Sequence, residues 1–335
     1  MSQTAPDAAT DMAASFLTMA EDAASDLVRA RKAIGTVIFG QDKVVEEALI
    51  TVLSGGHALL VGVPGLAKTR LVETMGRVLG LDARRVQFTP DLMPSDILGS
   101  EILDEASPGK RAFRFIRGPV FAELLMADEI NRASPRTQSA LLQAMQEGFV
   151  SIAGQRYDLP KPFHVLATQN PIEQEGTYPL PEAQLDRFLL QIDVDYPDRG
   201  AERRMLIETT GVASQNVEAV FSAEAISALQ RLVRRLPVGE GVVDAILDLV
   251  RAARPLPGTP LAQKLIWGPG PRAAQALMLA TRARALLDGR LAPSLEDVAA
   301  LAAPVLRHRM ALSFAARADG ESMADIIKGL VAKIL

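Results

Sequence analysis

Short apolar runs recur through the first two thirds of the chain and alternate with stretches of helical periodicity. These runs are residues 58–61, 86–88, 124–127, 164–167 and 188–192. Strands of a parallel sheet are buried on both faces, so they read as continuous apolar runs rather than as alternating ones. Helices between successive runs imply βαβ crossovers. We therefore predict a three-layer α/β domain built on a parallel sheet.

Beyond Pro197 the strand-like runs stop, and only helical patterns follow. They cover residues 223–235, 241–254, 271–288, 294–307 and 322–334. Ser294 and Asp297 form a candidate capping pair at the start of the fourth pattern. The sequence therefore predicts an α/β domain over residues 27–197 and a small all-helical domain over residues 198–335.

Residues 1–26 are rich in Ala and Asp and show little hydrophobic periodicity. We predict a flexible tail there, or at most a marginal helix. This start lacks the basic segment and apolar run of a signal peptide. No apolar stretch reaches the ~20 residues that a spanning helix needs. We therefore expect a cytoplasmic protein without membrane insertion.

The amino-acid composition argues against several kinds of functional site. The 335 residues contain no cysteine and three histidines far apart in sequence, which argues against disulfides, thiolate metal sites and a histidine metal site. Lys and Arg number 36 against 40 Asp and Glu, a net charge of −4. This balance weighs against broad coating of nucleic acid, although a local basic patch remains compatible with it.

A P-loop motif follows the first apolar run directly and precedes a helical stretch. It comprises Gly62, Val63, Pro64, Gly65, Leu66, Ala67, Lys68 and Thr69. In such a motif backbone N–H groups and the positive helix end surround phosphates. Lys68 then supplies a charge to the β- and γ-phosphates, and the Thr69 hydroxyl ligates Mg²⁺. Ala67 replaces the usual glycine, which is acceptable if its φ is negative, as at a helix start.

An acidic pair, Asp128 and Glu129, ends the third apolar run about 60 residues later. An apolar strand that delivers such a pair is the Walker B partner of a P-loop. Asp128 would hold Mg²⁺ and Glu129 would polarise the attacking water. Alone, the first motif could be an ordinary strand–turn–helix and the second the first acids of a helix. Together they predict nucleotide hydrolysis.

Several segments together carry a family resemblance. They are Gly62–Thr69, Thr89–Gly99, Asp128–Ala133, Ala167–Pro171 and Leu185–Phe188. These segments resemble those of the MoxR-type AAA+ ATPases, and the resemblance extends from about Ile34 to the C-terminus. Members of this family commonly have an alanine at the position of Ala67. The resemblance implies a hexameric ring that hydrolyses ATP with Mg²⁺ and remodels or matures partner proteins. It also implies a partner with a von Willebrand factor A domain.

The resemblance assigns three further roles. Asn170 would be sensor 1, whose amide bonds the attacking water or the γ-phosphate, although Asn-Pro is also a common turn pair. Arg187 resembles an arginine finger for a neighbouring subunit's nucleotide, the alternative being a surface arginine paired with Asp186. Arg272 resembles sensor 2, which would couple the helical lid to the γ-phosphate. Gly270 stands where the family often has a serine.

The resemblance also places the adenine and two insertions. Ile38, Gly40 and Gln41 would cup the adenine, the alternative being helix–helix packing. Residues 90–119 would form a helix-2 insert with a helical stretch and a basic, aromatic loop. Residues 149–158 read as a β-hairpin that faces the ring interior.

Two other functions stay open. Helicases and DNA-loading ATPases share these inserts, but a pI near 5.6 and the lack of a separate DNA-binding domain make a nucleic-acid motor the second choice. A nucleotide switch without hydrolysis is a further alternative, and the Asp128–Glu129 pair weighs against it.

Overall fold

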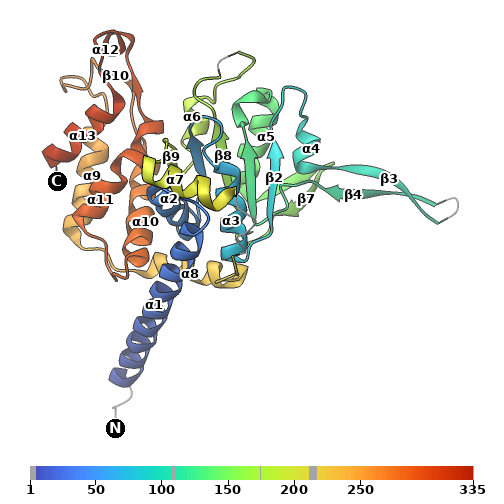
Figure 1. Ribbon diagram of the computed structural model, residues 1–335, viewed down its shortest axis with the longest axis horizontal. Helices are drawn as coiled ribbons and strands as arrows, with labels where there is room; N and C mark the ends of the chain where they lie inside the picture. Colours follow the sequence, from blue (N-terminus) through green and yellow to red (C-terminus); the bar gives the residue numbers. More distant parts are fainter. Residues whose placement is uncertain (1–4, 108–109, 174, 211–216, 335) are drawn as a thin grey trace.

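The computed structural model describes residues 5–107, 110–173, 175–210 and 217–334 of the chain. Figure 1 shows an α/β body beside a helical region formed by the C-terminal part of the chain. Two elements project from the body, the N-terminal helix α1 and a long hairpin of β3 and β4. The predicted fold class, an α/β domain followed by a helical lid, is confirmed.

A five-stranded parallel sheet in the order β2-β5-β8-β1-β9 lies at the centre of the body. Its strands are β1 (Ala58–Val61), β2 (Ala83–Gln87), β5 (Leu124–Asp128), β8 (His164–Gln169) and β9 (Leu190–Asp193). Each predicted apolar run coincides with one strand, and differences occur only at the ends.

Apolar clusters cover both faces of this sheet. Ala58 and Leu60 belong to one cluster, and Leu59, between them, belongs to the other. The first cluster includes residues of α2 (Asp42–Leu53) and α3 (Lys68–Leu79), and the second includes residues of α5 (Pro135–Glu147). Alternate side chains of a strand point to opposite faces, so both faces must be apolar.

The C-terminal part is helical apart from one small sheet. Its elements are α7 (Arg199–Thr209), α8 (Ala223–Arg235), α9 (Glu240–Ala252), β10 (Leu265–Trp267), α10 (Pro271–Leu287), α11 (Leu295–Leu306), η2 (Arg307–Arg309), β11 (Ala311–Leu312), α12 (Phe314–Ala318) and α13 (Met323–Ile334). The five predicted helical patterns correspond to α8–α11 and α13. The capping box of Ser294 and Asp297 is present at α11. Neither α7 nor the β10–β11 pair was predicted.

The prediction of a flexible tail over residues 1–26 is wrong for the described part. Residues Ala5–Gly35 form one helix, α1, and residues 1–4 lie outside the described residues. Ala20, Ala23 and Leu27 are buried at helical spacing, and α1 contacts α2, α3 and α10. Alanine has the highest helix propensity, and its small side chain lets helices approach closely. A hydropathy pattern made mainly of alanine is weak, which explains the error.

The basic, aromatic loop predicted within residues 90–119 is a strand. After α4 (Pro94–Leu98), β3 (Gly99–Ser107) and β4 (Lys110–Arg117) pair as an antiparallel hairpin whose tip, residues 108–109, lies outside the described residues. The second insert is the expected hairpin, β6 (Phe149–Ile152) and β7 (Gln155–Asp158). Phe115 of β4 stacks on Tyr157 of β7 with ring centroids 4.1 Å apart, so the two inserts are in contact.

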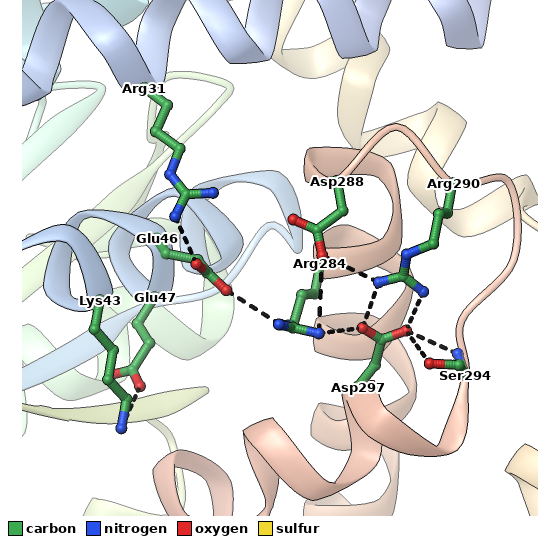
Figure 2. A network of polar contacts seen from close by, with 9 residues as sticks. All are labelled: Arg31, Lys43, Glu46, Glu47, Arg284, Asp288, Arg290, Ser294 and Asp297. Carbon is green, nitrogen blue, oxygen red and sulfur yellow. Dashed lines mark hydrogen bonds and ion pairs between the residues drawn. The ribbon is translucent and has the colours of Figure 1, made fainter.

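A chain of ion pairs joins α1, α2 and the lid (Figure 2). Glu46 of α2 accepts hydrogen bonds from Arg31 of α1 at 2.9 Å and from Arg284 of α10 at 3.1 Å. Arg284 and Arg290 both donate to Asp297, which is fully buried. Burial alone would raise the pKa of Asp297, but these bonds hold it below its usual value. The network therefore fixes the lid against the α/β body.

Candidate nucleotide site

The carboxyl ends of the parallel strands bring the predicted phosphate-binding residues to one edge of the sheet. The P-loop follows β1, the acidic pair ends β5, and Asn170 follows β8. In the register of the sheet, Val61 lies beside Gln169 and Ala127 beside Ala167. Ligands of α/β proteins bind at this edge, where the order of the strands reverses.

The P-loop is closed on itself by its lysine. Lys68 Nζ donates to the carbonyl oxygens of Gly62 and Val63, the latter at 3.2 Å. Burial lowers the pKa of Lys68, and the nearby carboxylates of Asp128 and Glu129 oppose this. At Gly62 a Cβ would lie 2.5 Å from the Val194 carbonyl oxygen, so only glycine lets the loop pass the end of β9. Thr69 follows, half-buried, as the second residue of α3.

The expectation of a negative φ at Ala67 is wrong. Ala67 is the N-cap of α3 and lies in the left-handed region, with φ +56° and ψ +21°. This conformation is the one that a glycine before the lysine adopts without strain. The loop keeps the shape of a P-loop although alanine is unfavourable there.

Replacement of Ala67 by glycine should therefore stabilise the fold. We expect the free energy of unfolding to rise by about 0.5–1 kcal/mol, because a left-handed alanine costs about 1–2 kcal/mol and glycine's freedom in the unfolded chain offsets part of that. Urea denaturation measures the change. The control is Ala300→Gly in the interior of α11, where an exposed alanine should lose about 1 kcal/mol. Equal losses at both positions would contradict strain at Ala67.

Asp128, the predicted magnesium ligand, is buried and already held from two sides. Arg85 of β2 donates to Oδ2 through Nη2 at 2.6 Å and Nε at 3.1 Å. Thr168 of β8 donates its hydroxyl proton to Oδ1. The register places Gln87 of β2 beside Asp128, which brings Arg85 within reach along the strand. These bonds orient the carboxylate at the edge where the phosphates would lie.

Glu129, the predicted water-polarising residue, has a restrained carboxylate. Its backbone is left-handed at φ +56°, and its N–H donates to the Thr168 hydroxyl at 2.9 Å. The Oε2 atom accepts from Gln87 Nε2 at 2.6 Å and from Arg132 Nη1, in η1 (Ile130–Arg132), at 2.9 Å. Arg85, Gln87 and Arg132 are site residues that the sequence did not predict. Arg132 stands three residues after Glu129, a spacing that could have suggested the contact.

Asn170 lies at this edge and is 8% exposed. Its Oδ1 accepts the backbone N–H of Ile172 at 3.2 Å, which is the turn interaction considered as the alternative to a sensor. The turn interaction and the proposed sensor role are compatible, because the amide nitrogen of Asn170 still has its own protons to donate. The turn bond orients that amide.

A cavity of about 380 Å³ opens beside the P-loop. Ile38 and Gln41, two of the predicted adenine contacts, line it together with Leu66, and Gln41 Nε2 donates to the Asp195 carbonyl at 2.7 Å. Residues of the segment after β9 complete it and were not predicted: Tyr196, Pro197, Glu202, Met205 and Thr209. Gly40, with φ +66°, is not among the lining residues. A Cβ there would meet Ala201 Cβ at 2.4 Å, so Gly40 lets this strip pack against α7.

Arg187 and Arg272 lie together, but not beside the P-loop. They line a separate cavity of about 250 Å³ at the junction of the α/β body and the lid. Arg187 follows α6 (Glu182–Leu185), and Arg272 is in the first turn of α10. Among the described residues, the Arg187 guanidinium has no ion-pair or hydrogen-bond partner. Asp186 pairs with lid arginines instead, so the alternative of an Arg187–Asp186 pair is not observed.

The fold and this sheet edge define a P-loop nucleotide-binding protein with a helical lid. Residues 57–190 match the ATPase family associated with various cellular activities (AAA), and residues 262–330 match the AAA lid domain. In the part of the chain that the structure describes, no helix combines the length and apolar character needed to cross a membrane.

Individual relatives extend the match over nearly the whole chain. Chaperone MoxR1 of Mycobacterium tuberculosis is 44% identical over 304 residues, which are 90% of this chain and 80% of the relative. Protein MoxR of Paracoccus denitrificans is 33% identical over 85% of this chain and 88% of its own length. A crystal structure of a candidate ATPase from Cytophaga hutchinsonii superposes with a TM-score of 0.87 at 35% identity, covering 97% of this chain and 98% of that one. The chain belongs to the MoxR family of AAA ATPases.

Proposed function

We propose that this protein is a cytoplasmic, Mg²⁺-dependent ATPase that works as a ring, hexameric by resemblance, and remodels or matures partner proteins. The proposal of a ring rests on one observation, which is that Arg187 and Arg272 lie away from the P-loop of their own chain. A site that hydrolyses ATP with these arginines must then receive them from a neighbouring subunit.

The parallel register supports this argument. Ala58 lies beside Leu190 and Val61 beside Asp193, so the parallel strands β1 and β9 start and end at the same level of the sheet. Arg187 comes before the start of β9, whereas the P-loop comes after the end of β1. The length of these strands separates the start of β9 from the end of β1 by about 10 Å. Arg187 thus lies at the end of the sheet opposite its own phosphate site, a position that suits an arginine finger for another subunit.

The residues at the phosphate edge suit a magnesium ion. Mg²⁺ prefers oxygen ligands, binds through few protein groups and keeps several waters. The Thr69 hydroxyl and the Asp128 carboxylate would hold it, and bound Mg²⁺ would neutralise charge on the phosphate oxygens. Lys68 would exchange its carbonyl partners for phosphate oxygens. Glu129 would accept a proton from the attacking water, and the Asn170 amide would orient that water or the γ-phosphate.

The relative named as a chaperone supports a protein client. We propose a client or adaptor with a von Willebrand factor A domain, on the family resemblance. Among the described residues nothing specific favours nucleic acid, and the net charge of −4 gives no general attraction to it.

Replacement of Lys68 by alanine tests the proposed ATPase at its phosphate site. We expect the affinity for Mg²⁺-ATP to fall about 10- to 10²-fold, because a charged group that bonds the phosphates is worth about 1.5–3 kcal/mol. Titration with a fluorescent ATP analogue measures the affinity, and phosphate release measures turnover. Lys32→Ala, an exposed lysine of α1, is the control and should change neither. Unchanged affinity in Lys68→Ala would show that the P-loop is not the phosphate site.

A further inference from the structure

One arginine of the lid is buried against the segment that carries Arg187. Arg309, in η2, is 2% exposed. Its Nε donates to Asp186 Oδ1 at 2.7 Å and its Nη2 to the carbonyls of Asp186 and Phe188 at 3.3 and 2.6 Å. Its Nη1 donates to the carbonyls of Leu189 and Val305 at 3.1 and 2.6 Å. All five N–H groups of the guanidinium therefore have partners, and four of these bonds go to residues 186–189.

These contacts determine whether the Arg187 guanidinium has an ion-pair partner within its own chain. Asp186 is the carboxylate next to Arg187 in sequence and would be its natural ion-pair partner. Arg309 occupies Asp186 Oδ1, and Arg272 Nη1 lies 3.7 Å from Oδ2, so two lid arginines share that carboxylate. The Arg187 guanidinium is left without an ion-pair partner among the described residues. It is thereby available for an external anion.

Outside the lid, the segment is held by the buried side chains of Phe188 and Leu189 and by the Leu189 N–H, which donates to the His57 carbonyl at 2.7 Å. Helix α6, which precedes it, is four residues long and contributes no buried side chain. The ring of Phe188 is buried, and its carbonyl also bonds His308 Nε2 at 3.1 Å. Both His308 and Arg309 belong to η2, so the lid supplies most of the polar contacts that hold residues 186–189. A shift of η2 would therefore break most of the polar contacts of this segment.

We propose that Arg309 is a positioning residue that presents Arg187 to the neighbouring subunit's nucleotide and keeps Asp186 from neutralising it. This inference rests on the proposed ring ATPase, in which Arg187 acts in trans. It makes the position of the lid in one subunit a determinant of ATP turnover in the next. Loss of Arg309 should therefore lower turnover at the adjacent site while the variant's own P-loop still binds ATP.

The test combines Arg309→Lys with mixed rings. Lysine keeps the charge but cannot make five bonds in the plane of the guanidinium. We expect turnover to fall about 10²-fold, the scale of a 1 Å misplacement of a catalytic group, with ATP affinity unchanged. Excess Glu129→Gln subunits, which supply an intact finger but no water activation, should restore turnover at the Arg309→Lys sites. A general loss of folding would lower ATP affinity as well and would not be rescued.

Controls separate this inference from the proposed function. Arg307→Lys, in the same turn η2, alters a lid arginine that pairs with Asp193 at the other end of β9, and its turnover should stay near wild type. If Arg309→Lys does not fold, Asp186→Asn carries the same mixing test. Wild-type turnover in the folded variant would overturn the role of Arg309. So would a loss that Glu129→Gln does not rescue while it does rescue Arg187→Ala. Failure to rescue Arg187→Ala would instead overturn the ring itself, and this inference with it.

Discussion

Glu129→Gln is expected to bind Mg²⁺-ATP normally and to lose turnover by about 10²–10⁴-fold, the usual contribution of a positioned general base. The amide has nearly the shape of the carboxylate but cannot accept a proton from water. In the structure the Glu129 carboxylate accepts bonds from Gln87 and Arg132, so the site is built around a charged group at this position. Single-turnover phosphate release and ATP titration separate the chemical step from binding.

The matched control is Glu123→Gln. Glu123 immediately precedes β5, so it lies at the opposite end of the strand that delivers Glu129, and its carboxylate accepts only the backbone N–H of Asp82 among the bonds described. This substitution should leave turnover near the wild-type rate. Hydrolysis at the wild-type rate in Glu129→Gln would show that another group activates the water.

The sheet and the phosphate edge could be predicted because each has a local signature. Burial on both faces favours apolar side chains, so β1, β5 and β8 contain the continuous apolar runs 58–61, 124–127 and 165–167, with polar residues at the ends of β5 and β8. The P-loop and the Asp128–Glu129 pair are short motifs at strand ends, so predicting the strands places the motifs. Parallel pairing then brings them to one edge without any long-range information.

Other features depend on contacts between distant segments. Gln87 reaches Glu129 only because β2 pairs with β5 in one particular register. Nothing near Arg309 in the sequence indicates that it is buried against residues 186–189. The left-handed backbone of Ala67 follows from the loop geometry and overrides the preference of alanine. These contacts and this backbone conformation depend on tertiary structure, and no hydrophobic periodicity in the sequence indicates them.

The helix α1 shows a different reason for failure. Its buried positions include Ala20, Ala23 and Ala30, which contribute little to any hydropathy pattern. Their small size permits close packing against α2, α3 and α10, so a weak signal corresponds to a real interface. Arg31 at the end of this helix then joins the ion-pair network of Figure 2 through Glu46.

Arg187→Ala is expected to reduce turnover by about 10³–10⁵-fold, the range found for arginine fingers in phosphoryl transfer. The affinity for Mg²⁺-ATP should change little, because Arg187 lies at the sheet edge opposite its own P-loop. The closest matched control is Arg136→Ala, an exposed arginine in the first turn of α5 that lines neither cavity. It should retain wild-type turnover.

Mixing distinguishes a finger in trans from a local structural role. An Arg187→Ala subunit has an intact P-loop and Glu129, and a Glu129→Gln subunit has an intact Arg187. Neither should hydrolyse ATP alone, but in a mixed ring the second can complete the site of the first. Activity should therefore rise from near zero to a maximum at intermediate ratios. Were Arg187 to act within its own chain, no ratio would restore activity, and the placement of Arg187 and Arg272 in a separate cavity would need another explanation.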